Sequence, residues 1–597
     1  MSTQQFSYDR VESPYGPKLA VQFDYDAAIV DALKRLSWSN THRAYNDPDD
    51  TDAVADYRCW TIDHTKDALK AFETELGTAV PDDYWPGGAP SDNSTVRLIV
   101  PEGSSHFRVE SQSDRVVSLL DAAFSYRVED AEYVTAYQNG EWDGKEHLFE
   151  TRFRRAPVGL LDRARALLES EGYSVSVERE APNTGREIAT EWTFDHDLRP
   201  YQREAIQAML DDDGGVVALP TGTGKTVVGL RFIHALESRA LVLVHSRELL
   251  HQWAERIEAT LGVEPGVIGD RQFTQGPVTV ATLQTVMKQG GNGAPSALDG
   301  DYGIVVFDEC HRTSAAEQMH EIGTDIDAFY RVGLSATPWR RVDGETLKIE
   351  AAVGPIAHEV SPQRMIQEGY LANPTFEVID PMDYGQPRHA SVNESYQNAK
   401  TRVIECDPAR LTAIASKTHK LADDGHQVLV NVSRKGHGRL IASMLDGTVS
   451  VDDIVAGIDN SDRKRQLRQS FQKLAQISNT DAVMLTGETP DAKRDSILDD
   501  LERGEQEIVI STILKEGVDI PSLDAVILAH GQRSDIETIQ TIGRVLRPSS
   551  GRGARVVDVI DRGRFFQEAY EERQQTMKDY YELEDSPSTE TPRRAVV

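Results

Sequence analysis

The stretch ALPTGTGKTVVGL (218–230) leads from an apolar strand end through a loop of small residues into a helical pattern. A loop that wraps phosphate oxygens needs small residues, because its backbone N–H groups must point inward, and the helix that follows turns its N-terminus toward the same anion. The spacing predicts a nucleotide site in which the lysine reaches the β- and γ-phosphates and the threonine after it holds Mg²⁺. The predicted phosphate-binding residues are Thr221, Gly222, Thr223, Gly224, Lys225 and Thr226. An accidental Gly-rich turn stays open for this loop alone, since position 219 is Leu where the strict pattern has Gly.

An acidic pair follows a second apolar run. IVVFDECH (304–311) reads as a buried strand that ends in Asp308 and Glu309. A carboxylate at the carboxyl end of a neighbouring parallel strand holds Mg²⁺, and the adjacent carboxylate orients the attacking water. We therefore predict Asp308 as a metal residue and both carboxylates as catalytic. A solvated strand end is the alternative for an isolated Asp-Glu pair.

The motif SATP (335–338) follows another apolar run. Its small hydroxyl residues could couple the phosphate state to a domain interface, and a simple turn is the alternative.

A basic motif, QTIGRVLRP (540–548), places Gln540, Gly543, Arg544 and Arg547 at helical i, i+3, i+4 and i+7. These positions share one helix face. Arginines from a second domain suit the neutralisation of γ-phosphate charge in the transition state. We predict Gln540, Arg544 and Arg547 as catalytic; an exposed salt-bridging face is the alternative.

The apolar pattern from about residue 191 onward predicts two α/β domains in tandem. Short buried runs alternate with helical patterns, which is typical of parallel sheets. The runs of the first domain are GVVALP, RALVLVH, PVTVAT, YGIVVFDE and RVGLSAT, and those of the second are HQVLVNVS, DAVMLTG, EIVISTI, DAVILAH and ARVVDVID. Earlier in the chain, strand-like KLAVQFDYD (18–26) and helical stretches at 27–36 and 65–76 indicate α+β modules.

Length and composition restrict the class of protein. At 597 residues the chain is too long for one core, so several domains are expected. Cys59, Cys310 and Cys406 lie far apart, which favours neither a disulfide framework nor a CxxC metal site. The absence of an eighteen-residue apolar run and the polar start MSTQQFSYDR predict a cytoplasmic protein.

The net charge of −33 leaves two interpretations open. The chain either avoids nucleic acid or comes from a high-salt cytoplasm, where an acidic surface keeps proteins soluble. We favour the halophilic interpretation, because the phosphate-binding motifs need a phosphate-rich partner and salt screens long-range repulsion.

The four motifs PTGTGKT, DECH, SATP and QTIGRVLR, in this order, resemble the ATPase motifs of superfamily 2 helicases. The resemblance covers about residues 191–570 and implies two tandem RecA-like parallel-sheet domains preceded by α+β accessory domains. LPTGTGKTVVGL, LSATPWR and QTIGRVLRP resemble the XPB-like and UvsW-like branch, and VTAYQNGEWDGKEHLFETRFRRAPVGLL (134–161) resembles the N-terminal domain of UvsW-like helicases. The chain departs from XPB proteins at WRRVDGE (339–345), where their Arg-Glu-Asp motif is altered or absent.

Composition, the apolar pattern and the resemblance together predict a domain plan. The expected parts are an α+β accessory module (1–94), a UvsW-like N-terminal α+β domain that binds DNA (95–190), RecA-like domain 1 (191–372), a linker (373–405), RecA-like domain 2 (406–570) with an insertion near 447–482, and a disordered C-terminal tail (571–597).

The resemblance also assigns site residues beyond the phosphate loop. Gln202 in LRPYQREA would read adenine, and Gly517 and Asp519 would link nucleic acid to ATP in the second domain. Arg247 in LVLVHSRELLHQW and Thr282 in TLQTV match motifs that contact nucleic acid.

Two further surfaces are candidates for nucleic-acid contact. RKRQLRQSFQK (463–473), with Arg463 and Arg465, is a positive island in an acidic chain, and a solvated helix face is its alternative. Trp142 and Tyr137 lie near several arginines in sequence, so their rings could stack on bases. A core anchor is the alternative for Trp142.

Together these features predict an ATP- and Mg²⁺-dependent DNA helicase or translocase that acts on duplex or branched DNA in repair or recombination. An RNA helicase and a DNA-damage-binding protein with a vestigial ATPase are the alternatives. A nuclease fusion is disfavoured, because no clustered carboxylate-and-lysine site is evident outside the ATPase motifs.

Overall fold

Buried runs of valine, leucine and isoleucine form the centre of an eight-stranded sheet in the first α/β region. Its order is β13-β12-β14-β11-β15-β16-β10-β17, and every pair is parallel except β12 with β13. The strands are β10 (Gly214–Ala218), β11 (Ala240–Val244), β12 (Gly266–Gly269), β13 (Gln272–Phe273), β14 (Val278–Thr282), β15 (Ile304–Asp308), β16 (Tyr330–Ser335) and β17 (Ile356–Glu359). The five predicted runs of this region are β10, β11, β14, β15 and β16, as expected.

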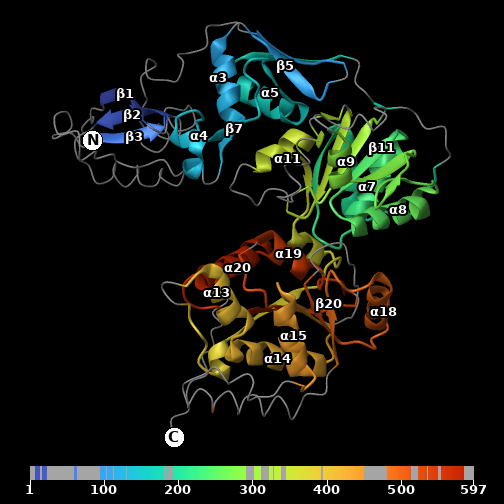
Figure 1. Cartoon of the computed structure of the whole chain (residues 1–597). Helices are drawn as coiled ribbons and strands as arrows, with labels where there is room; N and C mark the ends of the chain where they lie inside the picture. Colours follow the sequence, from blue (N-terminus) through green and yellow to red (C-terminus); the bar gives the residue numbers. More distant parts are fainter. Residues whose placement is uncertain are drawn as a thin grey trace. The chain divides into compact units, whose positions relative to one another are not determined.

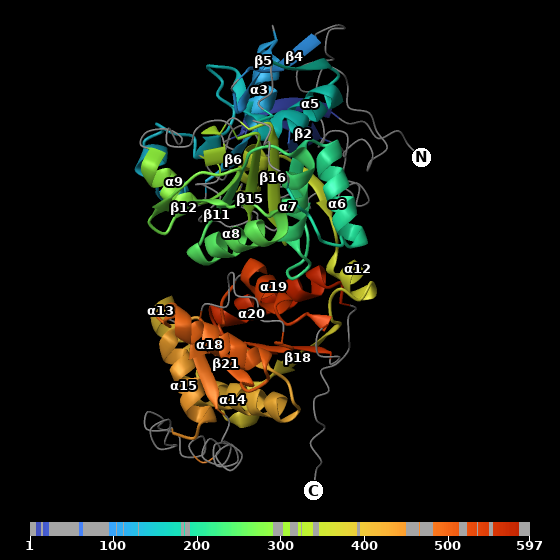
Figure 2. The same cartoon turned by 90° about the vertical axis from the view of Figure 1, so that its right-hand side faces the viewer.

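Helices cover both faces of this sheet, because strands buried on both sides need two layers of cover. Val217 and Val216 are neighbours on β10 and belong to two different buried clusters, one on each face. The helices are α6 (Pro200–Asp211), α7 (Lys225–Leu236), α8 (Arg247–Leu261), α9 (Leu283–Gly290), α11 (Glu345–Val353) and α12 (Pro362–Gln367). Figures 1 and 2 show α7 and α8 together beside the strands of this sheet.

A second sheet of six parallel strands follows, in the order β18-β23-β22-β19-β21-β20. The strands are β18 (Pro374–Ile379), β19 (Val428–Asn431), β20 (Ala482–Leu485), β21 (Ile508–Ser511), β22 (Ala525–Leu528) and β23 (Ala554–Val559). The helices are α13 (Tyr396–Ala399), α14 (Pro408–Asp423), α15 (Lys435–Leu445), α18 (Asp491–Glu502), α19 (Asp535–Gly543) and α20 (Phe566–Tyr580), with a π-helical segment at Lys400–Glu405. The predicted fold class, two tandem RecA-like parallel-sheet domains, is confirmed.

Smaller elements precede the parallel sheets. β1 (Ser7–Ser13), β2 (Gly16–Gln22) and β3 (Cys59–Asp63) form an antiparallel sheet. A four-stranded sheet has the order β8-β5-β4-β9, and β6 pairs with β7. These strands and their helices are β4 (Thr95–Val100), β5 (His106–Glu110), α3 (Asp114–Ala123), β6 (Ser125–Arg127), α4 (Thr135–Gln138), β7 (Lys145–His147), β8 (Arg155–Pro157), α5 (Leu161–Ser170) and β9 (Ser174–Arg179).

The computed structural model describes only part of the chain. The described residues are 7–13, 16–22, 59–63, 95–102, 104–111, 113–128, 131–180, 184–185, 192–290, 302–310, 320, 322–323, 325–326, 328–337, 345–390, 394–448, 465, 481–512, 522–533, 535–548 and 553–583. The predicted helical stretches 27–36 and 65–76 and the departure at 339–344 lie outside them. The chain divides into two units, Met1–Ile99 with Val109–Ala123 and Ala164–Glu178, and Val100–Arg108 with Phe124–Arg163 and Arg179–Val597; both parallel sheets belong to the second unit.

Two predicted boundaries are wrong. The linker expected at 373–405 begins with β18, which pairs with β23 and is therefore an edge strand of the second sheet. The tail expected at 571–597 begins inside α20, which runs to Tyr580 and buries Arg573 completely. The stretch EERQQTMKDY is mostly polar, as a tail would be, but Arg573 and Gln574 pair with the buried acids Asp558 and Asp561. The other domain limits stay predictions.

Candidate nucleotide and nucleic-acid sites

Three predicted motifs meet at one edge of the first sheet. β15 and β10 both pair with β16, so the carboxyl ends of these strands lie next to one another. These ends carry the loop 219–224, the pair Asp308-Glu309, and Ser335 of the SATP motif. The edge beyond the carboxyl ends of parallel strands is where ligands bind in open α/β sheets.

The loop before α7 has the shape that phosphate binding needs. Gly222 and Gly224 have φ values of 82° and 87°, the left-handed region that favours glycine. The Thr223 hydroxyl donates to the carbonyl of Pro220 at 2.6 Å, which closes the turn. α7 then begins at Lys225, so its N-terminal N–H groups open onto this loop.

Gln202 lies against this loop. Its side-chain amide donates to the Thr223 carbonyl at 3.1 Å, and its carbonyl accepts from the backbone N–H of Arg199. The Tyr201 hydroxyl donates to the same Thr223 carbonyl at 2.6 Å. Gln202 thus supports the loop from behind, and adenine recognition by Gln202 stays a prediction.

The acidic pair and the lysine lie together at the end of β15. Lys225 Nζ is 3.7 Å from Glu309 Oε1, and both Lys225 and Asp308 are buried. Burial, together with the charge of Glu309, raises the pKa of Asp308 to about 6. Glu309 has a φ of 50°, an unusual conformation for a residue other than glycine and one that clusters at functional sites.

The Asp308 carboxylate is held by two donors. Its Oδ1 accepts from the backbone N–H of Glu309 at 3.0 Å, and its Oδ2 accepts from Trp253 Nε1 at 2.8 Å. A carboxylate has about four acceptor positions, so both oxygens keep lone pairs for a cation. Such hard oxygen ligands suit Mg²⁺, and Thr226 lies in the first turn of α7 beside this edge. The residues present therefore fit the predicted metal.

The helix predicted to carry the basic motif ends earlier than expected. α19 ends at Gly543, so Arg544 and Arg547 follow in a turn and do not continue one helix face with Gln540. A Cβ on Gly543 would meet Thr221 Cβ at 2.7 Å, and a Cβ on Gly222 would lie 3.6 Å from Arg547 Nε. The arginines nevertheless reach the phosphate loop, because glycine lets the two backbones approach.

Burial changes the acidity of both arginines. It lowers the pKa of Arg544 to about 10, against the opposing charge of Glu309. It also lowers the pKa of Arg547, and the positive charge of Arg256 adds to that effect. Arg544 remains charged at neutral pH, in a place with little water to screen it.

The SATP motif is a tight turn that also contacts α20. The backbone N–H of Thr337 donates to the Ser335 hydroxyl at 3.0 Å, and both residues are buried. The Tyr580 hydroxyl donates to the Ala336 carbonyl at 3.4 Å. The motif therefore combines the predicted turn with a contact to a helix of the second sheet.

The candidate nucleic-acid residues have different surroundings. Arg247 begins α8, with a side chain that is 74% exposed and 3.5 Å from Asp270. Thr282 is buried and its hydroxyl pairs with Thr285 at 2.7 Å, and its contact with nucleic acid stays a prediction. Arg465 is exposed. Arg463, Gly517 and Asp519 lie outside the described residues.

Trp142 closes a turn and is half-buried. Its indole N–H donates to the Lys145 carbonyl at 2.7 Å, which is the arrangement of an anchor. The guanidinium of Arg127 lies over the Tyr137 ring at 5.4 Å. Contacts within the protein therefore hold both rings in place, and their contact with nucleic acid stays a prediction.

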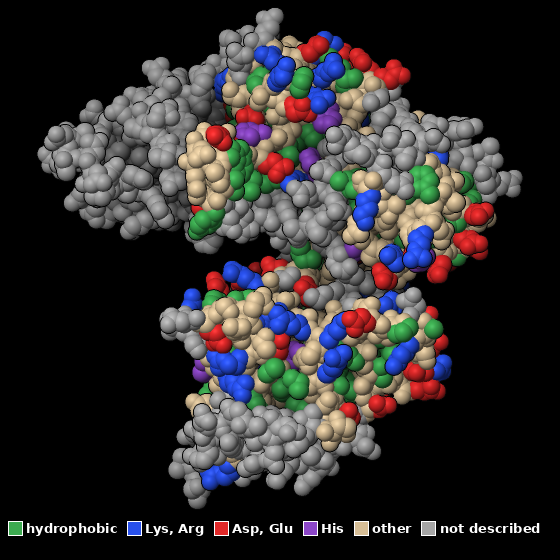
Figure 3. Space-filling view, viewed as in Figure 1, with side chains coloured by type: hydrophobic (Ala, Val, Ile, Leu, Met, Phe, Trp, Pro, Cys, Tyr) green, Lys and Arg blue, Asp and Glu red, His purple; other side chains and the backbone are tan. Residues whose placement is uncertain are grey.

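Three side chains at or near the candidate sites, Phe153, Tyr201 and Trp253, were not predicted from the sequence. Phe153 is 57% exposed, and the guanidinium groups of Arg152 and Arg155 lie 5.4 and 5.3 Å from its ring centre. The run RFRR was the available signal. Tyr201 and Trp253 lie inside motifs that were recognised, but nothing local indicated their partners. On the described part of the face in Figure 3, basic and acidic side chains are interspersed.

Membrane spans were searched among the described residues. No helix there is both long enough and apolar enough to cross a membrane.

Comparisons with known proteins agree with this geometry. Residues 195–340 match the family "Type III restriction enzyme, res subunit", and residues 457–549 match the "Helicase conserved C-terminal domain". The DNA 3'-5' translocase XPB2 of Sulfurisphaera tokodaii is 26% identical over 382 residues, which cover 62% of this chain and 82% of the relative.

Two further relatives extend the match. The Rad25 protein of Haloarcula marismortui is 28% identical over 403 residues, and this chain spans only 57% of its length. The ATP-dependent DNA helicase uvsW of Enterobacteria phage T4 is 22% identical over 485 residues, which cover 76% of this chain and 89% of the relative. The halophilic origin stays a prediction. Over these segments the chain is similar to superfamily 2 helicases, with relatives among the XPB, Rad25 and UvsW proteins.

Proposed function

We propose that this chain couples ATP hydrolysis to translocation on, or unwinding of, duplex or branched DNA in repair or recombination. The observation that carries the proposal is the convergence of Lys225, Glu309 and Arg544 at the carboxyl edge of the first sheet. A cation for the phosphates, a carboxylate for water and an arginine for the developing charge are the parts that phosphoryl transfer uses. The names of the relatives support DNA as the polymer.

Each residue has a separate role in this proposal. Lys225 binds the β- and γ-phosphates, and the loop backbone from Thr221 to Gly224 surrounds them. Glu309 orients the attacking water and accepts its proton. Lys225 Nζ lies 3.7 Å from Glu309 Oε1, so the phosphate-binding cation and the carboxylate that orients water are neighbours.

Thr226 and Asp308 are the residues that would hold Mg²⁺. When bound, Mg²⁺ neutralises charge on the β- and γ-phosphate oxygens. Arg544 and Arg547 add positive charge from the second sheet, and their burial keeps that charge unscreened. Gln540 would act with these arginines at the catalytic site. Gly517 and Asp519 would link nucleic-acid binding to the ATP site.

Phe153 is the best candidate for stacking on DNA. An exposed aromatic ring flanked by two guanidinium groups offers a surface for bases beside charges for phosphates. Trp142 stays a second candidate, with its ring fixed in a turn by the N–H hydrogen bond to the Lys145 carbonyl. Arg247 and Arg465 are exposed cations that could contact the backbone.

The test is ATP hydrolysis measured with duplex DNA, forked DNA, single-stranded DNA and RNA, each at low and high KCl. Stimulation by duplex or forked DNA supports the proposal and justifies unwinding assays. Stimulation by RNA alone would contradict it. A chain without hydrolysis under any condition would be a binding protein with a vestigial ATPase, and Lys225→Ala provides the background rate.

A further inference from the structure

Trp253 is a buried aromatic residue with a direct link to the acidic pair. It lies on α8, and its indole N–H donates to Asp308 Oδ2 at 2.8 Å across 55 residues of sequence. Both side chains are buried, with 1% and 5% of their surface exposed. Water therefore does not compete for this hydrogen bond, and loss of the donor would leave part of a buried carboxylate unsatisfied.

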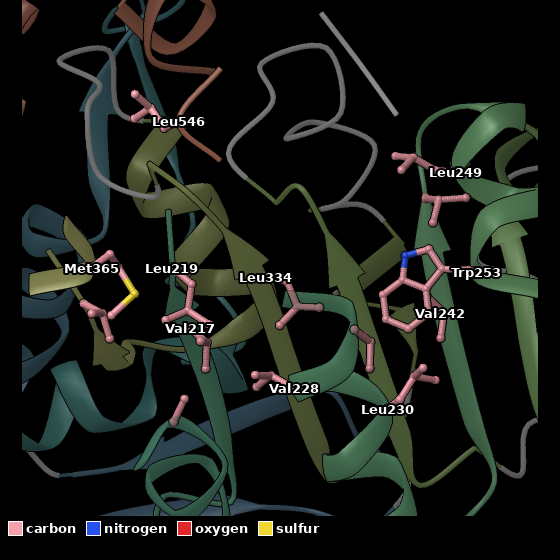
Figure 4. Close-up of a cluster of buried hydrophobic side chains, with 14 of the residues drawn as sticks. Val217, Leu219, Val228, Leu230, Val242, Leu249, Trp253, Leu334, Met365 and Leu546 are labelled. Atoms are coloured by element: carbon pink, nitrogen blue, oxygen red, sulfur yellow. The ribbon is translucent and has the colours of Figure 1, made fainter. Parts of the chain in front are cut away.

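Packing holds the Trp253 ring in one orientation. A Cβ on Gly229 of α7 would lie 3.1 Å from the far edge of the ring, and that position would also lie 3.1 Å from Leu334 of β16. Figure 4 shows the indole in the cluster that contains Val242, Leu230 and Leu334. A glycine at 229 thus makes room for the ring, and the ring has little freedom to turn its N–H elsewhere.

The hydrogen bond also has a fixed direction. An indole nitrogen only donates, so it always presents a donor to the carboxylate. The other oxygen of Asp308 accepts from the backbone of Glu309. Donors from two separate elements, α8 and the end of β15, therefore define the plane of the carboxylate.

We propose that Trp253 is a positioning residue that orients Asp308 for the divalent cation and so makes α8 part of the metal site. This inference rests on the proposed function, because it takes Asp308 as the residue toward Mg²⁺. Groups that orient a ligand through hydrogen bonds change metal affinity by about 10- to 100-fold when they are removed. α8 begins with the exposed Arg247, a candidate DNA contact. The same helix therefore carries that residue and, through Trp253, contacts Asp308.

The test compares Trp253→Phe with Trp192→Phe by measuring the dissociation constant of ADP in Mg²⁺ and in EDTA. Trp192 is a matched control, because its indole nitrogen is buried in the same region without a hydrogen-bond partner in the described structure. We expect Trp253→Phe to lower the Mg²⁺-dependent gain in ADP affinity by about 10-fold and to leave the affinity in EDTA unchanged. Trp192→Phe should leave both values unchanged.

A second variant guards against a packing effect of the smaller ring. Site-specific replacement of Trp253 by 3-benzothienylalanine keeps the shape and removes only the N–H, so it should reproduce the loss seen in Trp253→Phe. An unchanged Mg²⁺-dependent gain in this variant would overturn the inference, and so would an equal loss of affinity in EDTA. If the unmodified chain binds ADP equally well with and without Mg²⁺, this inference fails by itself, whereas the proposed function fails only if DNA does not stimulate ATP hydrolysis.

Discussion

Replacement of Arg573 should destabilise the second sheet. Its side chain is completely buried in α20 and contacts Asp558 at 3.1 Å and Asp561 at 3.2 Å. Arg410, also buried, pairs with Asp561 at 2.7 Å. Two buried cations thus balance two buried carboxylates, and Arg573→Met would remove one cation while keeping most of the volume.

The magnitude follows from what remains after the change. Asp561 keeps Arg410, whereas Asp558 keeps only neutral donors, the Gln574 side chain and the backbone of Val559. Removing one partner of a buried charge pair costs about 3–5 kcal/mol. We expect a loss of that size at pH 8 in the free energy of unfolding of the second sheet.

The loss should depend on pH in a defined direction. Burial already raises the pKa of Asp558, and the charge of Arg573 opposes that rise. In the variant the pKa of Asp558 therefore rises further above its unfolded value. When the folded-state pKa of a carboxyl is higher than its unfolded-state pKa, the free energy of unfolding decreases as the pH increases from the unfolded pKa to the folded pKa. The variant should regain up to about 1.4 kcal/mol for each pH unit as the pH falls through that interval.

Hydrogen exchange of peptides from β22 and β23 is the assay, because all seven tryptophans precede residue 340 and fluorescence does not report on this sheet. Arg533→Met is the control, since Arg533 is 59% exposed in its pair with Glu572 and such surface pairs contribute less than about 1 kcal/mol. The reasoning would be refuted if Arg573→Met cost less than 1 kcal/mol at pH 8. A loss that stays the same at pH 5.5 would show that packing, and not charge, is responsible.

Three further predictions concern the site and its supports. Lys225→Ala should abolish ATP turnover and leave the fold intact, because the lysine acts on phosphates; turnover at the original rate would overturn the phosphate-site assignment. Gly159→Ala should lower the unfolding free energy by about 1–3 kcal/mol, since its Cβ would lie 2.1 Å from a backbone oxygen of α11; Gly436→Ala, which meets nothing within 4 Å, is the control in urea unfolding. Phe153→Ala should weaken DNA binding by about 1–3 kcal/mol in a filter or anisotropy titration, with stability unchanged. Tyr133→Ala, an exposed ring, should lose less, and equal losses would argue against the arginine-flanked site.

The parts of the site that were predicted correctly depend on neighbours in sequence. The phosphate loop, its glycines and the start of α7 lie within a dozen residues. Local backbone geometry alone therefore fixes how Lys225 is placed relative to Gly222. The ten apolar runs became strands because a strand buried on both faces has a continuous apolar pattern. The sequence pattern did not predict β18. This edge strand begins with proline, and its side chains are exposed or half-buried, so it has no continuous apolar run.

The sequence by itself determined the buried strands of the two parallel sheets, the phosphate loop and the acidic pair, because each of these features consists of residues that are consecutive in the chain. Only the tertiary structure decided which side chains meet. Trp253 reaches Asp308 across 55 residues, and Arg410 reaches Asp561 across 151. Thr282 matched a motif and yet lies buried. Such contacts depend on the order in which the strands pair, and strand order is a property of the whole sheet that no local pattern contains.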